Sequence, residues 1–197
     1  MSYKVPFHNR ITIRPGEHKA TTEATVLSTL LGSCVAACLY DPVSHVSGMN
    51  HFLLANRRYA RDMPLSITEA GRYGINAMEL LINDMMKLGA MRSRLRAKVF
   101  GGGSILDTKR ETGFLCVGEV NQRFIREFIK TEGLTLVSED LGGELGRVIH
   151  FHTDTFQVFR RFIAKTQTKN IEKQELGYWR KSIETPEERE GPIVLFQ

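Results

Sequence analysis

The segment from Ser28 to Leu54 constrains the fold of this chain most, because it joins two apolar runs through a short polar turn. The turn has the sequence Tyr-Asp-Pro-Val-Ser-His at residues 40–45. Aspartate and serine bond back to nearby backbone in turns, and proline removes a donor that a central strand would need. The pattern predicts a β-hairpin. A turn centred on residues 42 and 43 pairs residues whose numbers sum to 85, which places Cys34 opposite His51.

A facing Cys34 and His51 are candidates for a catalytic pair. Directly opposed residues have Cβ atoms about 4.5–5.5 Å apart, so that a thiol and an imidazole can meet. An imidazole that takes the thiol proton makes the sulfur a better nucleophile. The neighbouring Gly32 and Ser33 would present backbone N–H groups to an oxyanion. A buried cysteine beside a core histidine is the alternative, and spacing alone leaves both interpretations open.

The register of the hairpin decides between these interpretations. Proline suits the centre of a two-residue hairpin turn poorly, so a longer loop is also compatible with the sequence. A slip of one residue would put Cys34 and His51 on opposite faces of the sheet. A third polar group could orient the imidazole: Ser28 has the strand parity of Cys34, whereas Thr29 points the other way.

Two amphipathic helices are expected after the hairpin, over Ser66–Leu88 and Asn121–Lys130. In the first, Ser66 and Glu69 fit a capping box, and glycines follow both helices. The apolar positions recur every three or four residues and predict buried faces: Met78, Leu81, Ile82, Met85 and Leu88 in the first helix, Phe124, Ile125, Phe128 and Ile129 in the second. Strands are expected over 11–13, 91–99, 134–137, 147–153 and 156–163.

A glycine run at residues 101–103 follows the predicted strand 91–99. Glycine-rich turns after strands can bring backbone N–H groups to an anion, although many are simple packing turns. The run lacks a following Lys-Ser or Lys-Thr pair and is therefore not a P-loop. The strand before it alternates Arg92, Arg94, Arg96 and Lys98 with smaller residues, which predicts one basic face.

Composition indicates one cytoplasmic domain with a charged extension. The 197 residues are 42% hydrophobic and carry a net charge of +5, with no apolar run of membrane-spanning length and no secretory signal. Three cysteines do not suggest a disulfide framework, and no ligand set at metal-binding spacing is present. The basic residues are spread out without a nucleic-acid motif. We expect a domain over 1–164 and a charged, flexible tail over 165–197.

The motif LGSCVAACLYDP followed by GMNHFLL resembles the signature of the CheD family of chemoreceptor glutamine deamidases. Three later stretches fit the same pattern: LGAMRSRLRAKVFGGGSIL, VGEVNQRFIREFI and SEDLGGELGRVIHFHTDT. The resemblance covers about residues 8–164. It implies an α+β fold, a layered α/β/β sandwich of mostly antiparallel sheets with two main helices packed on them. The sequence departs from the family pattern at Phe156, where an acidic-Thr-Gly turn is usual.

The resemblance also implies chemistry. Selected glutamine side chains of methyl-accepting chemotaxis receptors would be hydrolysed to glutamate and ammonia through a cysteine thioester, without a cofactor or metal. Cys34 would be the nucleophile, His51 the general base and acid, and Ser28 would stand where the family usually has a threonine. The site would be lined by Gly32, Ser33, Asn50, Gly102 and Gly103.

The partners implied are the cytoplasmic helices of the receptors, which could recruit the protein to membrane receptor arrays, and a CheC-type phosphatase. Nucleic acid binding and membrane insertion are not expected. One alternative is a receptor- or phosphatase-binding adaptor with little catalysis. A second is a cysteine hydrolase or transglutaminase-like enzyme with another substrate, which would incorporate amines.

Overall fold

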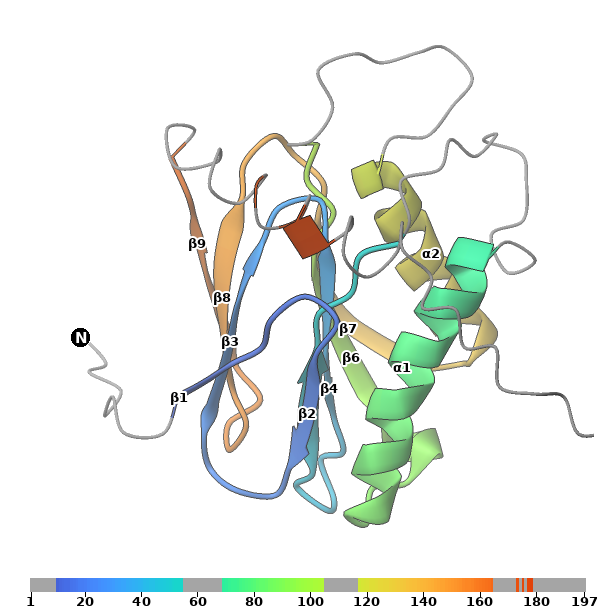
Figure 1. The fold of residues 1–197 in the computed structure, drawn as a ribbon. Helices are drawn as coiled ribbons and strands as arrows, with labels where there is room; N and C mark the ends of the chain where they lie inside the picture. The colour runs from blue at the N-terminus through green and yellow to red at the C-terminus, as the bar shows by residue number, and fades with distance from the viewer. Residues whose placement is uncertain are drawn as a thin grey trace, which may run out of the picture.

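The described part of the computed structural model comprises residues 10–54, 69–104 and 117–164, together with Lys173, Glu175, Gly177 and Tyr178 of the tail. Three layers are stacked, with two helices on one side, a five-stranded sheet in the middle and a four-stranded sheet on the other side (Figure 1). This arrangement confirms the predicted layered α+β fold.

The two sheets are mixed but mostly antiparallel. The four-stranded sheet has the order β1-β3-β8-β9: β1 (Arg10–Thr12), β3 (Val26–Leu31), β8 (Arg147–His152) and β9 (Val158–Phe162). The five-stranded sheet has the order β2-β5-β4-β6-β7: β2 (His18–Thr21), β5 (Ser47–Asn50), β4 (Val35–Tyr40), β6 (Arg96–Gly101) and β7 (Thr135–Leu141). Among the described strands, the pairs β1–β3 and β6–β7 are parallel and the other pairs are antiparallel.

Helices α1 (Glu69–Lys87) and α2 (Val117–Thr131) pack on the outer face of the five-stranded sheet (Figure 1). Their predicted apolar stripes are buried there, except Leu88, which lies beyond α1 and is 44% exposed. The expected glycine ends are confirmed, because Gly89 and Gly133 both have positive φ angles. Helix α2 begins four residues before its predicted start, so that Asn121 lies inside it rather than at its cap.

The first apolar run of the sequence does not form a single hairpin arm. It forms β3 in one sheet and β4 in the other, joined by residues 32–34. Besides the core between the helices and the five-stranded sheet, a separate hydrophobic core fills the space between the two sheets. It includes Leu27, Cys34, Cys38 and Phe151. The connection therefore lies where the two sheets meet, with the Cys34 side chain buried in the core between them.

The predicted hairpin exists between β4 and β5, but its predicted register is wrong by two residues. Cys38 pairs with Met49 and Tyr40 with Ser47, so paired numbers sum to 87. The reason is a longer loop: the Asp41 N–H donates to the Val46 carbonyl at 2.9 Å, and His45 within the loop has a φ of 55°. Because side chains alternate with a period of two, a shift of two preserves the face on which each side chain lies.

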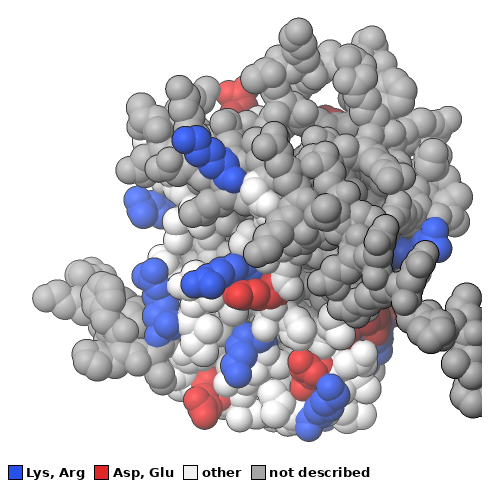
Figure 2. Space-filling model, viewed as in Figure 1, with Lys and Arg blue, Asp and Glu red and all other residues white. Residues whose placement is uncertain are grey.

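The predicted basic strand begins only at Arg96. Residues Arg92–Arg94 form a short 3₁₀ helix, and their guanidinium groups make ion pairs instead of one solvated face. Arg94 binds the Asp41 carboxylate, and Arg92 binds Glu79 and Glu132. Basic and acidic side chains are interspersed on the face shown in Figure 2. None of the helices described is long and apolar enough to cross a membrane.

Candidate active site

The loop that joins β3 to β4 presents three consecutive backbone N–H groups to one carboxylate. That carboxylate belongs to Glu175 of the tail, which lies beside the loop although it is more than 140 residues distant in sequence. Its oxygens accept from Gly32 N at 2.9 Å, Ser33 N at 3.0 Å and Cys34 N at 3.2 Å. The Ser33 hydroxyl donates as well, at 2.6 Å. Converging backbone amides of this kind form an anion-binding concavity, and the Cys34 sulfur belongs to the same residue as one of them.

The glycine run at residues 101–103 holds this loop through hydrogen bonds to the loop carbonyls. Gly102 N donates to the Cys34 carbonyl and Gly103 N to the Gly32 carbonyl, each at 2.7 Å. Holding the carbonyls on one side leaves the N–H groups of the loop available on the other. Gly101, with a φ of 116°, has no space for a Cβ because the Cys34 carbonyl lies against it. Gly102 and Gly103 thus position the loop, and their own amides are occupied by it.

Asn121 of α2 fixes the same loop from the helix side, a role that the sequence analysis missed. Its amide nitrogen donates to the Ser33 carbonyl at 2.9 Å, and its amide oxygen accepts from Leu54 N at 2.9 Å. A buried asparagine inside an apolar helix face was the available signal. Asn50 is turned toward α1 instead, bonding Ala37 N and the Ala77 carbonyl.

Thr29 is the hydroxyl residue that contacts His51. Its Oγ1 lies 2.7 Å from His51 Nδ1 and donates at 2.6 Å to the Ile13 carbonyl. A hydroxyl has a single proton, so Thr29 accepts a hydrogen bond from Nδ1–H of the imidazole. Neutral His51 then has its lone pair on Nε2, a buried atom without a hydrogen-bond partner in the described structure. This is the tautomer a general base requires.

Ser28 does not contact His51, contrary to the sequence expectation. Its hydroxyl bonds His150 Nδ1 at 2.7 Å on the neighbouring strand β8. The parity argument assumed that residues 28 and 34 lie in one strand. The chain turns between the sheets at residues 32–34, and this turn reverses which neighbour, Ser28 or Thr29, faces the site.

Cys34 and His51 lie on the same face of the five-stranded sheet. Val35 and Phe52 exchange hydrogen bonds at 3.0 and 2.9 Å, so Cys34 is diagonal to His51 rather than directly opposite. Diagonal neighbours have Cα atoms about 7–8 Å apart, with Cβ atoms somewhat closer. Both side chains are buried, at 0% and 2% exposure.

The electrostatic environment keeps both groups neutral in this structure. Burial raises the pKa of the Cys34 thiol well above its ordinary value, and the charge of Glu175 and a hydrogen bond to it raise the pKa further. Burial lowers the pKa of His51 from 6.5 to about 4, although the Glu175 charge opposes this. The site therefore holds a thiol and a neutral imidazole, each sensitive to what occupies the place of Glu175.

The buried neutral His51 predicts that stability falls on mild acidification. Its folded-state pKa lies below its unfolded value, so the unfolded chain binds the proton more readily between about pH 6.5 and pH 4. Moving from pH 7 to pH 5 should cost about 2 kcal/mol from this residue alone. Burial also lowers the pKa of His150, which adds a loss of the same sign.

Urea unfolding at the two pH values would measure this effect. His51→Gln should lose less stability than the wild type between them, while the His150 contribution remains. Carboxyl groups with lowered pKa values lose their contribution only below about pH 4, outside this window. Equal losses in wild type and variant would contradict the assignment of a buried neutral His51.

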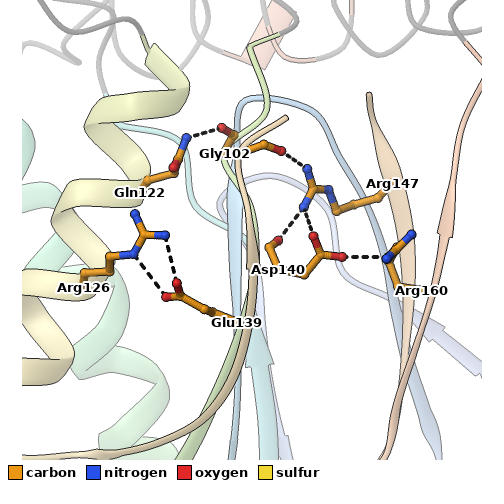
Figure 3. Close-up of polar contacts among 8 residues, drawn as sticks. Gly102, Gln122, Arg126, Glu139, Asp140, Arg147 and Arg160 are labelled. Atoms are coloured by element: carbon orange, nitrogen blue, oxygen red, sulfur yellow. Dashed lines mark hydrogen bonds and ion pairs between the residues drawn. The ribbon is translucent and has the colours of Figure 1, made fainter. Parts of the chain in front are cut away.

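A group of ion pairs braces the far side of the glycine run (Figure 3). Arg147, buried at the start of β8, binds the Asp140 carboxylate at 2.8 Å and the carbonyls of Asp140 and Gly142. Arg160 reaches the same carboxylate at 2.7 Å. Gln122 of α2 donates to the Gly102 carbonyl at 2.7 Å. Because the Gly142 N–H in turn donates to the Gly101 carbonyl, the brace connects β7 and β8 to the loop support.

Removing Arg147 should destabilise the fold strongly. Arg147→Met leaves two carbonyls and part of the Asp140 carboxylate without a donor, which should lower the free energy of unfolding by about 2–4 kcal/mol. The matched control is Arg126→Met, which removes an exposed pair with Glu139 drawn in the same view (Figure 3). That change should cost less than about 1 kcal/mol in denaturant unfolding. Equal effects would contradict the brace.

Other sequence expectations are only partly covered by the structure. Cys34 and Cys38 are free thiols, and no cluster of three metal-ligating side chains occurs within the described ranges. The predicted capping residue Ser66 and the third cysteine, Cys116, lie outside the described residues. Phe156, at the family departure, has a φ of 58° and stacks on Tyr40 with ring centroids 4.4 Å apart. The backbone there has the left-handed conformation that glycine adopts freely.

Comparisons with known proteins place the chain in a family. Residues 53–162 match the family model described as CheD chemotactic sensory transduction. A probable chemoreceptor glutamine deamidase CheD 1 of Geobacter sulfurreducens is 56% identical over 94% of this chain and 93% of its own length. A probable chemoreceptor glutamine deamidase CheD 2 of Shewanella oneidensis is 39% identical over 94% of each chain. A protein of the same name from Chromobacterium violaceum is 44% identical over 94% of this chain and 89% of its own. With this identity along nearly the whole length, the chain belongs to the CheD family.

Proposed function

We propose that the protein is a glutamine deamidase that hydrolyses selected glutamine side chains of chemoreceptors to glutamate and ammonia. The observation that carries the proposal is the anion site beside Cys34, where three backbone N–H groups and the Ser33 hydroxyl converge on one carboxylate. A carboxylate is the product of amide hydrolysis, and the same donors suit the oxyanion that precedes it. The relatives named as chemoreceptor glutamine deamidases supply the substrate.

In the proposed mechanism, His51 Nε2 takes the Cys34 proton as the sulfur attacks the amide carbon. The carbonyl oxygen becomes an oxyanion held by the N–H groups of residues 32–34. His51 then gives its proton to the departing nitrogen, so that ammonia leaves and a thioester remains. Water, deprotonated by His51, cleaves the thioester to glutamate and restores the thiol. No step uses a cofactor.

Thr29 is the positioning residue in this scheme. By accepting from Nδ1–H it fixes the ring and keeps the lone pair at Nε2. The proposal replaces Ser28, the residue favoured by the sequence, with Thr29. Gly32 and Ser33 supply oxyanion donors, Gly102 and Gly103 support them, and Asn50 has no contact with the pair in the described structure.

The substrate surfaces in this proposal are the cytoplasmic helices of methyl-accepting receptors, which would recruit the protein to receptor arrays. A CheC-type phosphatase is a further proposed partner. The contrasting function is an adaptor that binds such partners with little catalysis. The two differ in whether bound receptor is chemically changed.

The test is incubation of the purified protein with a receptor cytoplasmic fragment, followed by ammonia measurement and peptide mass spectrometry. Deamidation releases ammonia and gives the small mass increase of an amide-to-acid conversion at particular glutamines. An adaptor would bind the fragment and leave its mass unchanged. A transglutaminase-like enzyme, supplied with a primary amine, would incorporate that amine instead of producing glutamate. Either of these outcomes would overturn the proposal.

A further inference from the structure

The anion site beside Cys34 is filled by the chain itself. Glu175 is only 2% exposed, and its carboxylate takes up the N–H groups of all three loop residues and the Ser33 hydroxyl. All four donors are electrically neutral, as they would be for a transient oxyanion. A glutamate side chain is also the product of the reaction proposed above. The tail thus places the product's functional group where the substrate's would be.

A second contact holds the same stretch of the tail. Tyr178, three residues after Glu175 in a helical stretch, lies with its hydroxyl 2.6 Å from the Tyr73 hydroxyl of α1. Its ring packs against Gly16, where a Cβ would collide with it, and against the core between the sheets. Gly16 N in turn donates to the His51 carbonyl at 2.8 Å. Residues three apart on a helix share a face, so one face of this stretch carries both contacts.

The tail contact also bears on both reacting groups. The Glu175 charge raises the pKa of Cys34 and opposes the lowering of that of His51. A carboxylate that acts on both groups lies close to the nucleophile and to the histidine. The described tail residues are drawn in dark red in the upper half of Figure 1, near the ends of β3 and β4 that residues 32–34 join.

We propose that Glu175, anchored with Tyr178, occupies the catalytic site as an internal analogue of the deamidation product and competes with the substrate glutamine for the donors of residues 32–34. The proposal rests on the function proposed above. Substrate binds only when the tail has left, so the apparent affinity for receptor is reduced by the fraction of molecules that are closed. Anything that draws the tail away increases activity without changing the catalytic residues.

The first test measures access to Cys34 and needs no substrate. Full-length wild type, Glu175→Ala and Lys173→Ala are treated with iodoacetamide, and labelling of the Cys34 peptide is followed by mass spectrometry. Glu175→Ala should label at least about tenfold faster than wild type, because the closed population falls. Lys173 is exposed on the same stretch, so Lys173→Ala should label as wild type does. Tyr178→Ala, which removes the other anchor, should also accelerate labelling.

The second test uses receptor fragment kinetics. Glu175→Ala should lower KM for the fragment with little change in kcat, because an internal competitor has been removed. If Glu175 instead assists the reaction, kcat falls in this variant, which overturns the proposal. Unchanged labelling of Cys34 in both Glu175→Ala and Tyr178→Ala also overturns it. Faster labelling without any ammonia release from receptor would count against the deamidase function while leaving the tail in the site.

A third test determines whether the side chain at position 175 lies within reach of the Cys34 sulfur. Glu175→Gln puts a side-chain amide at the donors, where Cys34 can attack its carbon, release ammonia and leave a thioester that water hydrolyses. Tandem mass spectrometry should therefore find glutamate at position 175 of the purified variant. Combining Glu175→Gln with Cys34→Ala should preserve the amide. An amide retained in both proteins would contradict the placement of this side chain at the reacting sulfur.

Discussion

Cys34→Ala should reduce ammonia release from a receptor fragment to the uncatalysed background, a loss of roughly 10³-fold or more, because the covalent route disappears with the sulfur. The oxyanion donors of residues 32–34 are backbone groups and remain in the variant. They cannot compensate, because they do not form a bond to the amide carbon, and the Ser33 hydroxyl beside them is itself one of the donors. The measurement is ammonia release at saturating receptor, with peptide mass spectrometry at the modified glutamines.

The fold should survive this change. Cys34 is a small side chain in the core between the sheets, and its loop is held mainly through backbone groups by Gly102, Gly103 and Asn121. Removing the sulfur should cost no more than about 1–2 kcal/mol in unfolding free energy. Circular dichroism and denaturant unfolding would verify that the variant is folded.

Cys38→Ala is the matched control. Cys38 has the same 0% exposure, belongs to the same core and lies four residues further along the same sheet. It has no donor loop beside it, and burial raises the pKa of its thiol far above the ordinary value, so that it stays protonated and unreactive. Cys38→Ala should retain activity. Ammonia release at wild-type rates by Cys34→Ala would refute the assigned nucleophile.

Much of the fold could be predicted from the periodic spacing of apolar residues in the sequence. The apolar stripes of α1 and α2 are local patterns, and burying them against a sheet requires no knowledge of distant residues. The pairing of Cys34 with His51 on one face also survived an error in register, because the error was an even number of residues. Local patterns were sufficient to predict these elements and the faces that they bury, but not the length of the hairpin loop that sets the register.

The features that were missed depend on contacts between distant residues. Thr29 rather than Ser28 faces His51 because the chain changes sheets at residues 32–34, which strand parity cannot show. The hydrogen bond from Asn121 to the Ser33 carbonyl joins segments about 90 residues apart. The hydrogen bonds from residues 32–34 to Glu175 join segments about 140 residues apart. In the sequence, Glu175 is one acid among many in a charged tail. Only the fold distinguishes it.

Thr29→Val should lower kcat by about 10- to 100-fold while changing KM little, because the variant removes the acceptor that fixes the His51 tautomer. The loss should be smaller than when a carboxylate is removed from a catalytic triad, since the threonine hydroxyl carries no charge. Valine keeps the shape of the side chain. The hydroxyl also donates to the Ile13 carbonyl, so a stability loss of about 1–2 kcal/mol is expected as well.

Two further variants separate orientation of the imidazole from general stability. Thr29→Ser retains a hydroxyl that can bond both Ile13 and His51, and it should restore most of kcat. Ser28→Ala removes an equally buried hydroxyl on the same strand together with its bond to His150. It should lose similar stability and keep its activity. If Ser28→Ala lowered kcat as much as Thr29→Val, or if Thr29→Ser failed to rescue it, Thr29 would not be the residue that orients His51.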